Sequence, residues 1–306
     1  MNYAFIISFS CSFFILILGV YVFRFAPLKY SNIRLNYLLM TLSLGQWVFF
    51  SSLRYFIPKE LIDIYSNYAL IPSALVPFFL TRVTTQLIGE IKILNKLRYF
   101  QYSILSYILI SCLFCKAIIV NPDAIAQFKP LLAYHVLIFY SIIYIGASTF
   151  WMLKNGIQSK GAKRVRSHLL MLGTLIGLFV SILFVYVLPF FGIFLGLLSC
   201  LGILPATLFW SVAILQYNAF ETKSMILKSR FLAKRQVPLL SRLTFRPVLW
   251  FHFLLDPLDY RLQLRSSRAE VVQSMLQYHL TLQEGAAMSH RSKIRKVAAF
   301  FESYFK

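Results

Sequence analysis

Seven long apolar runs constrain the folding of this chain more than any other feature of its sequence. A helix needs about 20 mostly apolar residues to cross about 30 Å of hydrocarbon, because its backbone finds no water there. Runs of this kind lie at 4–23, 37–57, 65–87, 99–120, 131–153, 168–189 and 190–217. They predict an all-α, polytopic membrane protein, in which a seven-transmembrane-helix bundle precedes a short helical cytoplasmic tail. Pro72, Pro77 and Arg82 interrupt the third run, where we expect a bend.

The composition excludes an ordinary water-soluble domain. Apolar residues make up 59% of the 306 residues and charged residues only 13%, whereas ordinary globular chains carry about 25% charged residues. A soluble protein of this length would still need a polar surface, and this chain has too few polar side chains to form one. We therefore expect a lipid bilayer around most of it.

The basic residues are distributed unevenly among the loops. Lys and Arg outnumber Asp and Glu by 31 to 10, which gives a net charge of +21. The first, third and fifth loops are basic, whereas the second, fourth and sixth have no excess of basic residues. Because Lys and Arg gather on the cytoplasmic side, this alternation places the N-terminus outside the inner membrane and the C-terminus in the cytoplasm. The same alternation explains the net positive charge of the chain, so we expect no nucleic-acid partner. The basic residues of the fifth loop include Lys160, Lys163, Arg164 and Arg166.

Polar residues inside the apolar runs are the candidates for function, because a polar group is costly in lipid unless it is paired or used. The residues that we expect in a polar interior are Gln46, Arg82, Thr85 and His135. A single histidine such as His135 is more often a hydrogen-bonded structural residue than a reactive one.

No spacing of residues predicts catalysis. The chain contains neither a His-x-x-x-His pattern nor a Walker loop, and the seventh run lacks the lysine that retinal would need. The four cysteines lie in apolar runs, where cysteine behaves as a small hydrophobe, although Cys112 and Cys115 form a C-x-x-C pair. We therefore expect a protein that is not an enzyme and has no catalytic residue, metal site or cofactor.

The segment after the seventh run has a different composition. Residues 217–306 hold 15 of the 31 basic residues, and we divide the chain into a transmembrane domain at 1–221 and a tail at 222–306. The basic part at 223–246 is typical of a segment on an anionic inner leaflet. An apolar patch at 248–255 is too short to span a membrane and should dock on the membrane interface or on the bundle.

The end of the tail has two helical patterns. Ser267-x-x-Glu270 has the form of a capping box and predicts a helix that ends near Gly285. A second helix is expected from Ser289. This helical hairpin pairs either with a second copy of the chain, giving a homodimer, or with itself.

Two segments of the second half carry a recognisable pattern. Residues 163–170 read KRVRSHLL, two apolar helices with a very short turn at Pro189 follow, and residues 209–221 read FWSVAILQYNAFE. This pattern resembles the N-terminal seven-helix sensor region of bacterial histidine kinases, over 1–221 in topology and over about 160–221 in motif. In that family the last span commonly closes on an Ala-Ile-Leu-x-Tyr-x-Leu-Phe-like segment. The matching residues here are Ala213, Ile214, Leu215, Tyr217 and Phe220, with Ala219 where a leucine is usual.

The resemblance implies a receptor that couples a stimulus to a cytoplasmic output. The 90 or so residues after the last span are too few for both a phosphoacceptor helix and an ATP-binding domain, and the Glu and Pro of an acceptor helix are missing around His290. We therefore expect a non-catalytic sensor that relays a stimulus, by helix movement, to a cytoplasmic signalling protein. A small transporter or channel is one alternative, and a structural or assembly protein of the cell envelope is another.

Overall fold

The computed structural model describes residues 3–26, 31–88, 92–120, 128–193, 195–215 and 239–267, together with residues 269 and 273. The chain divides into two compact units. The first unit contains Met1–Gln158 and Arg166–Leu215, and the second contains Ser159–Val165 and Gln216–Lys306. The loop that begins at Ser159 therefore groups with the tail.

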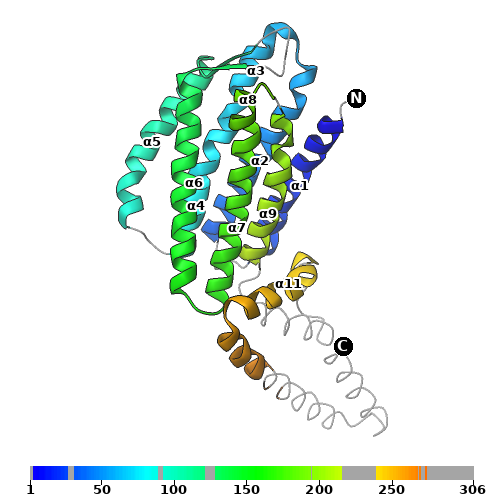
Figure 1. Ribbon diagram of the computed structural model, residues 1–306, viewed down its shortest axis with the longest axis vertical. Coiled ribbons are helices and arrows are strands. Elements are labelled where there is room, and N and C mark those ends of the chain that lie inside the picture. Colours follow the sequence, from blue (N-terminus) through cyan, green and yellow to red (C-terminus); the bar gives the residue numbers. More distant parts are fainter. Residues whose placement is uncertain are drawn as a thin grey trace. The chain divides into compact units, whose positions relative to one another are not determined.

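The first unit is a bundle of long helices that run side by side (Figure 1). Helix α2 packs against α1, α4 and α9, and α4 also packs against α5 and α6. Each apolar run of the sequence is largely helical. The long helices of the described part of this unit are α1 (Tyr3–Phe25), α2 (Ser31–Leu53), α4 (Leu70–Ile88), α5 (Lys92–Leu113), α6 (Leu132–Gln158), α7 (Ala162–Ile182) and α9 (Cys200–Leu215).

Five helical segments of the described chain are long and apolar enough to cross a membrane, which is consistent with a multi-pass membrane protein. The predicted count of seven spans is not confirmed. The apolar part of α5, Tyr99–Leu113, is shorter than 18 residues. Helix α2 carries polar side chains such as Thr41 and Ser43, which are buried among its neighbours, and a helix surrounded by protein needs fewer apolar residues than one surrounded by lipid. The five segments are Phe5–Phe25, Lys59–Ile88, Leu132–Gln158, Ala162–Phe190 and Gly196–Leu215.

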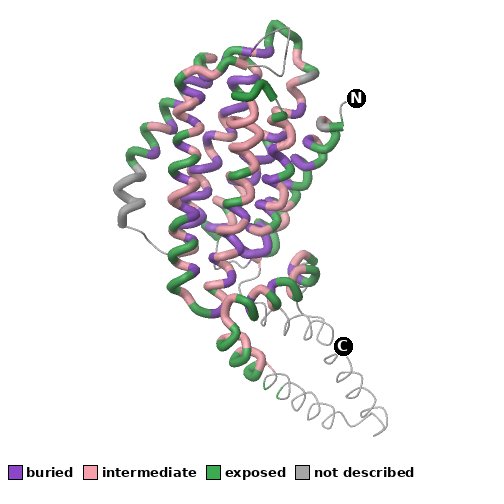
Figure 2. Tube along the Cα trace, viewed as in Figure 1, coloured by how far each residue is buried: buried purple, intermediate pink, exposed green. Residues whose placement is uncertain are grey.

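The outward faces of the bundle are apolar. Figure 2 shows exposed positions along the outer sides of the helices, and large apolar side chains occupy many of them. Phe14 of α1 is 58% exposed, Phe139 of α6 is 69% exposed and Phe179 of α7 is 70% exposed. Soluble proteins rarely expose contiguous apolar surface of this kind. The surface is therefore compatible with a surrounding lipid bilayer.

The fourth run ends as a strand, which the all-helical prediction missed. Helix α5 stops at Leu113, and Cys115 then adopts a left-handed φ of 54°. Lys116 N–H donates to Ser111 O over 2.8 Å, which is the hydrogen bond that closes a Schellman motif. The chain continues as β1 (Ile118–Val120), which pairs in antiparallel register with β2 (Phe128–Pro130), Ile118 opposite Pro130.

Helix α3 (Ile62–Tyr68) fastens this hairpin to the bundle. The Asn67 side chain accepts hydrogen bonds from the backbone N–H groups of Ala117 and Ile118, and it donates to Ile118 O over 2.9 Å. Asp63 accepts a further bond from Val120 N–H over 2.6 Å. The third run is divided at Ala69, between α3 and α4, and Pro77 stays inside α4.

The connection from α7 to α9 is longer than the predicted turn. A π-helical segment, η4 (Leu183–Val187), extends α7 into the short helix α8 (Leu188–Phe190). The chain turns at Gly192, with φ of 75°, and becomes helical again at η5 (Gly196–Ser199). The seventh run is therefore helical from Gly196, later than the predicted residue 190.

Small residues allow α7 and α9 to pack closely. A Cβ atom at Gly173 would lie 3.0 Å from Ala206 O, and one at Gly177 would lie 3.0 Å from Ala206 Cβ. In the opposite direction, a Cβ atom at Gly202 would lie only 2.3 Å from Val180 Cβ. These spacings form a small-x-x-x-small pattern on each helix, which lets two backbones approach within a membrane.

In the second unit, α11 (Leu239–Leu255) includes the whole apolar patch at 248–255. A second helix follows over residues 257–267. Asp256 caps it, because its Oδ1 accepts the Asp259 N–H over 3.2 Å, and Pro257 takes the first helical position. Residues 257–267 are helical without interruption, so this helix begins before Ser267 and the predicted start there is wrong. The predicted helix from Ser289 lies outside the described residues.

Candidate functional site

A cavity of about 110 Å³ lies at the end of the bundle that carries the β-hairpin. We call it the end cavity. Arg54, which follows α2 in the 3-10 turn η2 (Arg54–Phe56), lines it beside the polar side chains of Ser51 and Tyr65. The Tyr65 hydroxyl donates to Phe50 O over 2.9 Å, which holds α3 against the end of α2. The full lining is Trp47, Phe50, Ser51, Arg54, Tyr65, Ser66, Ala69, Leu70, Ile118, Phe128, Tyr134, Phe184, Val185, Pro189, Gly196 and Leu197.

A second cavity of about 100 Å³, the bundle cavity, lies deeper among α2, α4, α6, α7 and α9. Its walls are mostly apolar, with a few hydroxyl groups. Trp47, Leu70, Tyr134 and Val185 line both cavities, so the two spaces adjoin. The remaining lining residues are Leu44, Ser73, Val76, Pro77, Leu80, Leu137, Ile138, Ser141, Ile145, Thr174, Gly177, Leu178, Ser181, Ile182, Ile203, Ala206 and Trp210.

The irregular backbone of η4 forms part of the boundary between the cavities. Val185 O accepts the Tyr134 hydroxyl over 2.7 Å, and Tyr186 OH lies 3.2 Å from His135 Nδ1. These two bonds join η4 to the first turn of α6. Single π-helical turns inside α-helices occur frequently at functional sites. The backbone irregularity of the chain at this point therefore coincides with the cavities.

The four candidate interior residues lie in three different places, and none lines either cavity. Gln46 is exposed on α2. Arg82 of α4 donates to the Tyr102 hydroxyl and lies over the Phe78 ring, 5.2 Å from its centroid. The neighbouring Thr85 donates to Arg82 O. His135, bonded to Tyr186, lies at the hairpin end.

Hydroxyl groups, rather than these four residues, make up much of the buried polar interior. The Tyr37 hydroxyl of α2 lies 2.8 Å from Ser211 Oγ of α9, and it donates to Thr207 O over 3.0 Å. Trp210 Nε1 donates to Thr174 Oγ1 over 3.1 Å, which joins α9 to α7. Such bonds satisfy polar groups inside a membrane bundle. They fix the helices around the bundle cavity.

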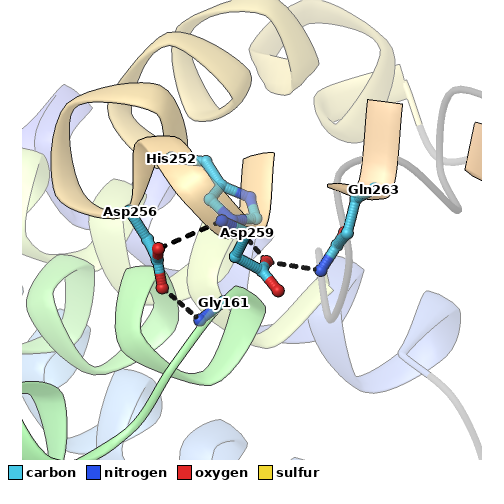
Figure 3. Close-up of polar contacts among 5 residues, drawn as sticks. All are labelled: Gly161, His252, Asp256, Asp259 and Gln263. Atoms are coloured by element: carbon cyan, nitrogen blue, oxygen red, sulfur yellow. Dashed lines mark hydrogen bonds and ion pairs between the residues drawn. The ribbon is translucent and has the colours of Figure 1, made fainter. Parts of the chain in front are cut away.

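Within the second unit, five residues form a hydrogen-bonded cluster that we call the tail clamp: Gly161, His252, Asp256, Asp259 and Gln263 (Figure 3). Gly161 N–H donates to Asp256 Oδ2 over 3.0 Å, which joins the loop between α6 and α7 to the tail. His252 Nε2 donates to Asp259 Oδ2 over 3.0 Å, and Gln263 Nε2 donates to the same oxygen over 2.7 Å. His252 is buried, with 1% of its surface exposed.

The electrostatic environment of the tail clamp favours a charged Asp256. Partial desolvation raises the pKa of its carboxyl group, but hydrogen bonds from the N–H groups of Gly161 and Asp259 lower it, as do the nearby charges of Arg164 and His252. The net effect is a pKa below the ordinary value of an aspartate. Asp256 therefore accepts both backbone bonds as a carboxylate over most of the pH range.

Gly161 is required by the local geometry of the tail clamp. Its φ is 62°, in the left-handed region that glycine adopts most easily. A Cβ atom there would lie 2.6 Å from Asp259 Oδ2 and 3.0 Å from Asp259 Cγ. The loop and the tail therefore meet without room for a side chain.

The other residues of interest are distributed as follows. In the fifth loop, Lys160 and Lys163 are exposed and Arg164 is half-buried. Arg166 of α7 donates to Leu87 O over 3.3 Å. The exit-motif residues Ala213, Ile214 and Leu215 form the end of α9, the first two buried. Tyr217 and Phe220 lie outside the described residues.

Comparisons with known protein families, with curated proteins and with solved structures find no match. Within the part of the chain that the structure describes, no group of three or more His, Cys, Asp or Glu residues is placed to hold a metal ion. The candidate site therefore rests on the geometry of the cavities and of the tail clamp.

Sequence reasoning missed Arg54 and the tail clamp. Arg54 lies near the end of an apolar run, where a charged residue is ordinarily taken to snorkel to the interface. Asp256-Pro257, in contrast, carried a readable signal, because Asp is favoured before a helix and Pro at its first position. Nothing in the sequence indicated that this turn would contact Gly161.

Proposed function

We propose that the protein is an integral inner-membrane sensor of a bacterial signalling system, which relays a stimulus by helix movement to a cytoplasmic partner without catalysis of its own. One observation carries the proposal. Helix α6 and the segment α7–η4 both line the cavities. The loop that connects α6 to α7 is hydrogen-bonded to the tail, through Gly161 N–H and Asp256. In this proposal the hairpin end faces outward and the tail lies in the cytoplasm.

The relay follows from how packed helices move. Closely packed elements have discrete arrangements, and a ligand shifts the balance between them when it binds one arrangement more tightly. Because α7 and α9 pack closely at Gly173 and Ala206, a displacement of one of these helices in this proposal moves the other with it. Since α6 ends at Gln158 and α7 begins at Ala162, a displacement of either helix is transmitted to Gly161 and hence to Asp256.

The resemblance to the sensor regions of histidine kinases supports the same proposal. The proposed partners are the lipid bilayer, a cytoplasmic signalling protein and, through the tail, a second copy of the chain. The output of such a sensor would be the altered position of its tail rather than a reaction.

A capture experiment tests the relay. The full chain, with an affinity tag, is cross-linked in native membranes as wild type, as Gly161→Ala, which disturbs the tail clamp, and as Gly192→Ala. Gly192 also has a positive φ, but nothing lies within 4 Å of a Cβ placed there. We expect a soluble signalling protein to be captured in different amounts by wild type and Gly161→Ala, and in equal amounts by wild type and Gly192→Ala. No partner, or equal capture by all three chains, would contradict the proposal.

A transporter is the rival that the position of the bundle cavity favours, since α2, α4 and α6 all line it. Its walls include Val76, Leu80 and Leu137, which suit an apolar ligand better than a water-filled path. Flux of solutes across reconstituted vesicles distinguishes the two functions. The sensor proposal predicts no flux, and saturable flux through the wild-type chain would favour the transporter.

A further inference from the structure

The end cavity and the bundle cavity differ in chemistry although they adjoin. The end cavity presents the cation of Arg54 together with the polar groups of Ser51 and Tyr65. The bundle cavity presents mainly hydrocarbon, including Val76 and Leu137. The space therefore changes from positive and polar to apolar along its length. A ligand that matched it would have an anionic group at one end and a short apolar chain at the other.

Arg54 is placed to recognise that anionic group. Its side chain is half-buried in the wall of the end cavity, and at reduced dielectric a cation interacts more strongly with an anion than it does in water. A guanidinium group carries five N–H donors, so it can bind a carboxylate while it keeps other partners. Tyr65 and Ser51 add hydroxyl groups in the same wall. The wall thus offers both charge and hydrogen bonds.

The volumes limit the size of the ligand. The cavities measure about 100 Å³ and about 110 Å³. An apolar cavity of about 150 Å³ holds one benzene molecule, so the two together suit a ligand of roughly eight to ten non-hydrogen atoms. This is far smaller than a phospholipid. It is the size of a medium-chain carboxylate such as octanoate.

We propose that the two cavities form one binding site for a small, free amphipathic carboxylate, with its carboxylate at Arg54 and its chain in the bundle cavity. The inference deepens the proposed function by naming the class of stimulus, and it rests on that function only for the consequence of binding. The α6 and α7–η4 segments that contact such a ligand are the ones that lead to the loop of the tail clamp.

Binding is tested directly on the purified full chain in nanodiscs, with radiolabelled octanoate in a scintillation proximity assay. We expect saturable binding that unlabelled octanoate displaces and that equal concentrations of octanol do not, because octanol lacks the charge. Arg54→Gln should weaken binding about tenfold or more, as expected for the loss of a charge-assisted hydrogen bond. Arg82→Gln is the matched control, since Arg82 lies outside both cavities, and it should bind as wild type. Thermal unfolding of each variant confirms that it is folded.

Three results would overturn the inference: no saturable binding to the wild-type chain, displacement by octanol as efficient as by octanoate, or unchanged affinity in folded Arg54→Gln. The assay is run in phosphatidylcholine and in phosphatidylglycerol nanodiscs. Equal affinity in the two supports a free carboxylate. Strong competition by phosphatidylglycerol would assign the cavity to an anionic lipid headgroup instead, and would also overturn the inference.

Amide exchange of residues 159–165, measured with and without octanoate, separates this inference from the proposed function. Octanoate that binds without altering exchange in that loop leaves the site intact and contradicts the relay. A chain that fails to bind octanoate but still captures a partner in a clamp-dependent manner refutes the ligand class and leaves the relay intact.

Discussion

Replacement of Gly161 by alanine tests the tail clamp most sharply, because two separate costs act at this position. The left-handed backbone, with φ of 62°, costs a residue with a Cβ about 1–2 kcal/mol. That cost alone corresponds to roughly a 5- to 30-fold larger open fraction. The new methyl group would also meet Asp259 Oδ2 at 2.6 Å. This carboxylate already accepts bonds from His252 and Gln263, so moving it weakens both.

Hydrogen exchange measures this opening, since the exchange rate of a protected amide reports how often its local structure opens. In Gly161→Ala we expect the amides of residues 159–165, 256 and 258–263 to exchange at least fivefold faster than in wild type, after correction for intrinsic rates. Gly192→Ala has the same type of backbone cost, at φ of 75°, without a neighbouring atom. It should accelerate exchange only around its own turn. Wild-type exchange in the loop of Gly161→Ala, or equal loop opening in both variants, would refute the role given to Gly161.

Three further substitutions test other parts of the structure. Because the pKa of Asp256 is lowered in the folded chain, its contribution to stability is present above the pH at which an unfolded aspartate titrates, about 4, and is lost as the pH falls through the folded pKa. The difference in thermal unfolding midpoint between wild type and Asp256→Asn should therefore shrink below about pH 4, and a difference that grew there would contradict the assignment. Gly202→Ala brings a Cβ atom to 2.3 Å from Val180 Cβ and should lower stability by about 1–3 kcal/mol. Gly196→Ala, with open space around it, should not show that loss, and equal midpoints for the two variants would exclude close packing of α7 on α9. Cys115→Gly should raise the unfolding midpoint, because the left-handed conformation costs a residue with a Cβ about 1 kcal/mol and costs glycine little. A lowered midpoint would show instead that the packing of the thiol outweighs this cost.

The apolar runs predict the helices of the bundle well, because both lipid-facing and tightly packed membrane helices require a sustained apolar segment. They do not predict where each helix ends. Helix α5 stops through a left-handed residue that is Cys115, a residue type that carries no turn signal. The strand that follows depends on Asn67, which is 51 positions away from Ile118. Such contacts are set by the fold rather than by the local sequence.

The candidate site was less predictable than the bundle. Gln46, Arg82, Thr85 and His135 were chosen by polarity within an apolar run, which does not reveal the direction of each side chain around its helix. Arg54 reaches the end cavity because α2, α3 and the hairpin converge there. The tail clamp joins two residues 95 positions apart, so local patterns could show the capped turn at Asp256 but not its partner.

The proposed function assumes one orientation of the chain, in which the end cavity faces outward and the tail clamp lies in the cytoplasm. Lys129 on the hairpin and Lys160 in the loop between α6 and α7 are both exposed. Each is replaced by cysteine in the full chain and labelled in intact cells with a membrane-impermeant maleimide, with the wild-type chain as the blank. We predict that Lys129→Cys is labelled in intact cells and that Lys160→Cys is labelled only after permeabilisation. Labelling of both positions from the same side, or of Lys160→Cys alone in intact cells, would contradict the account.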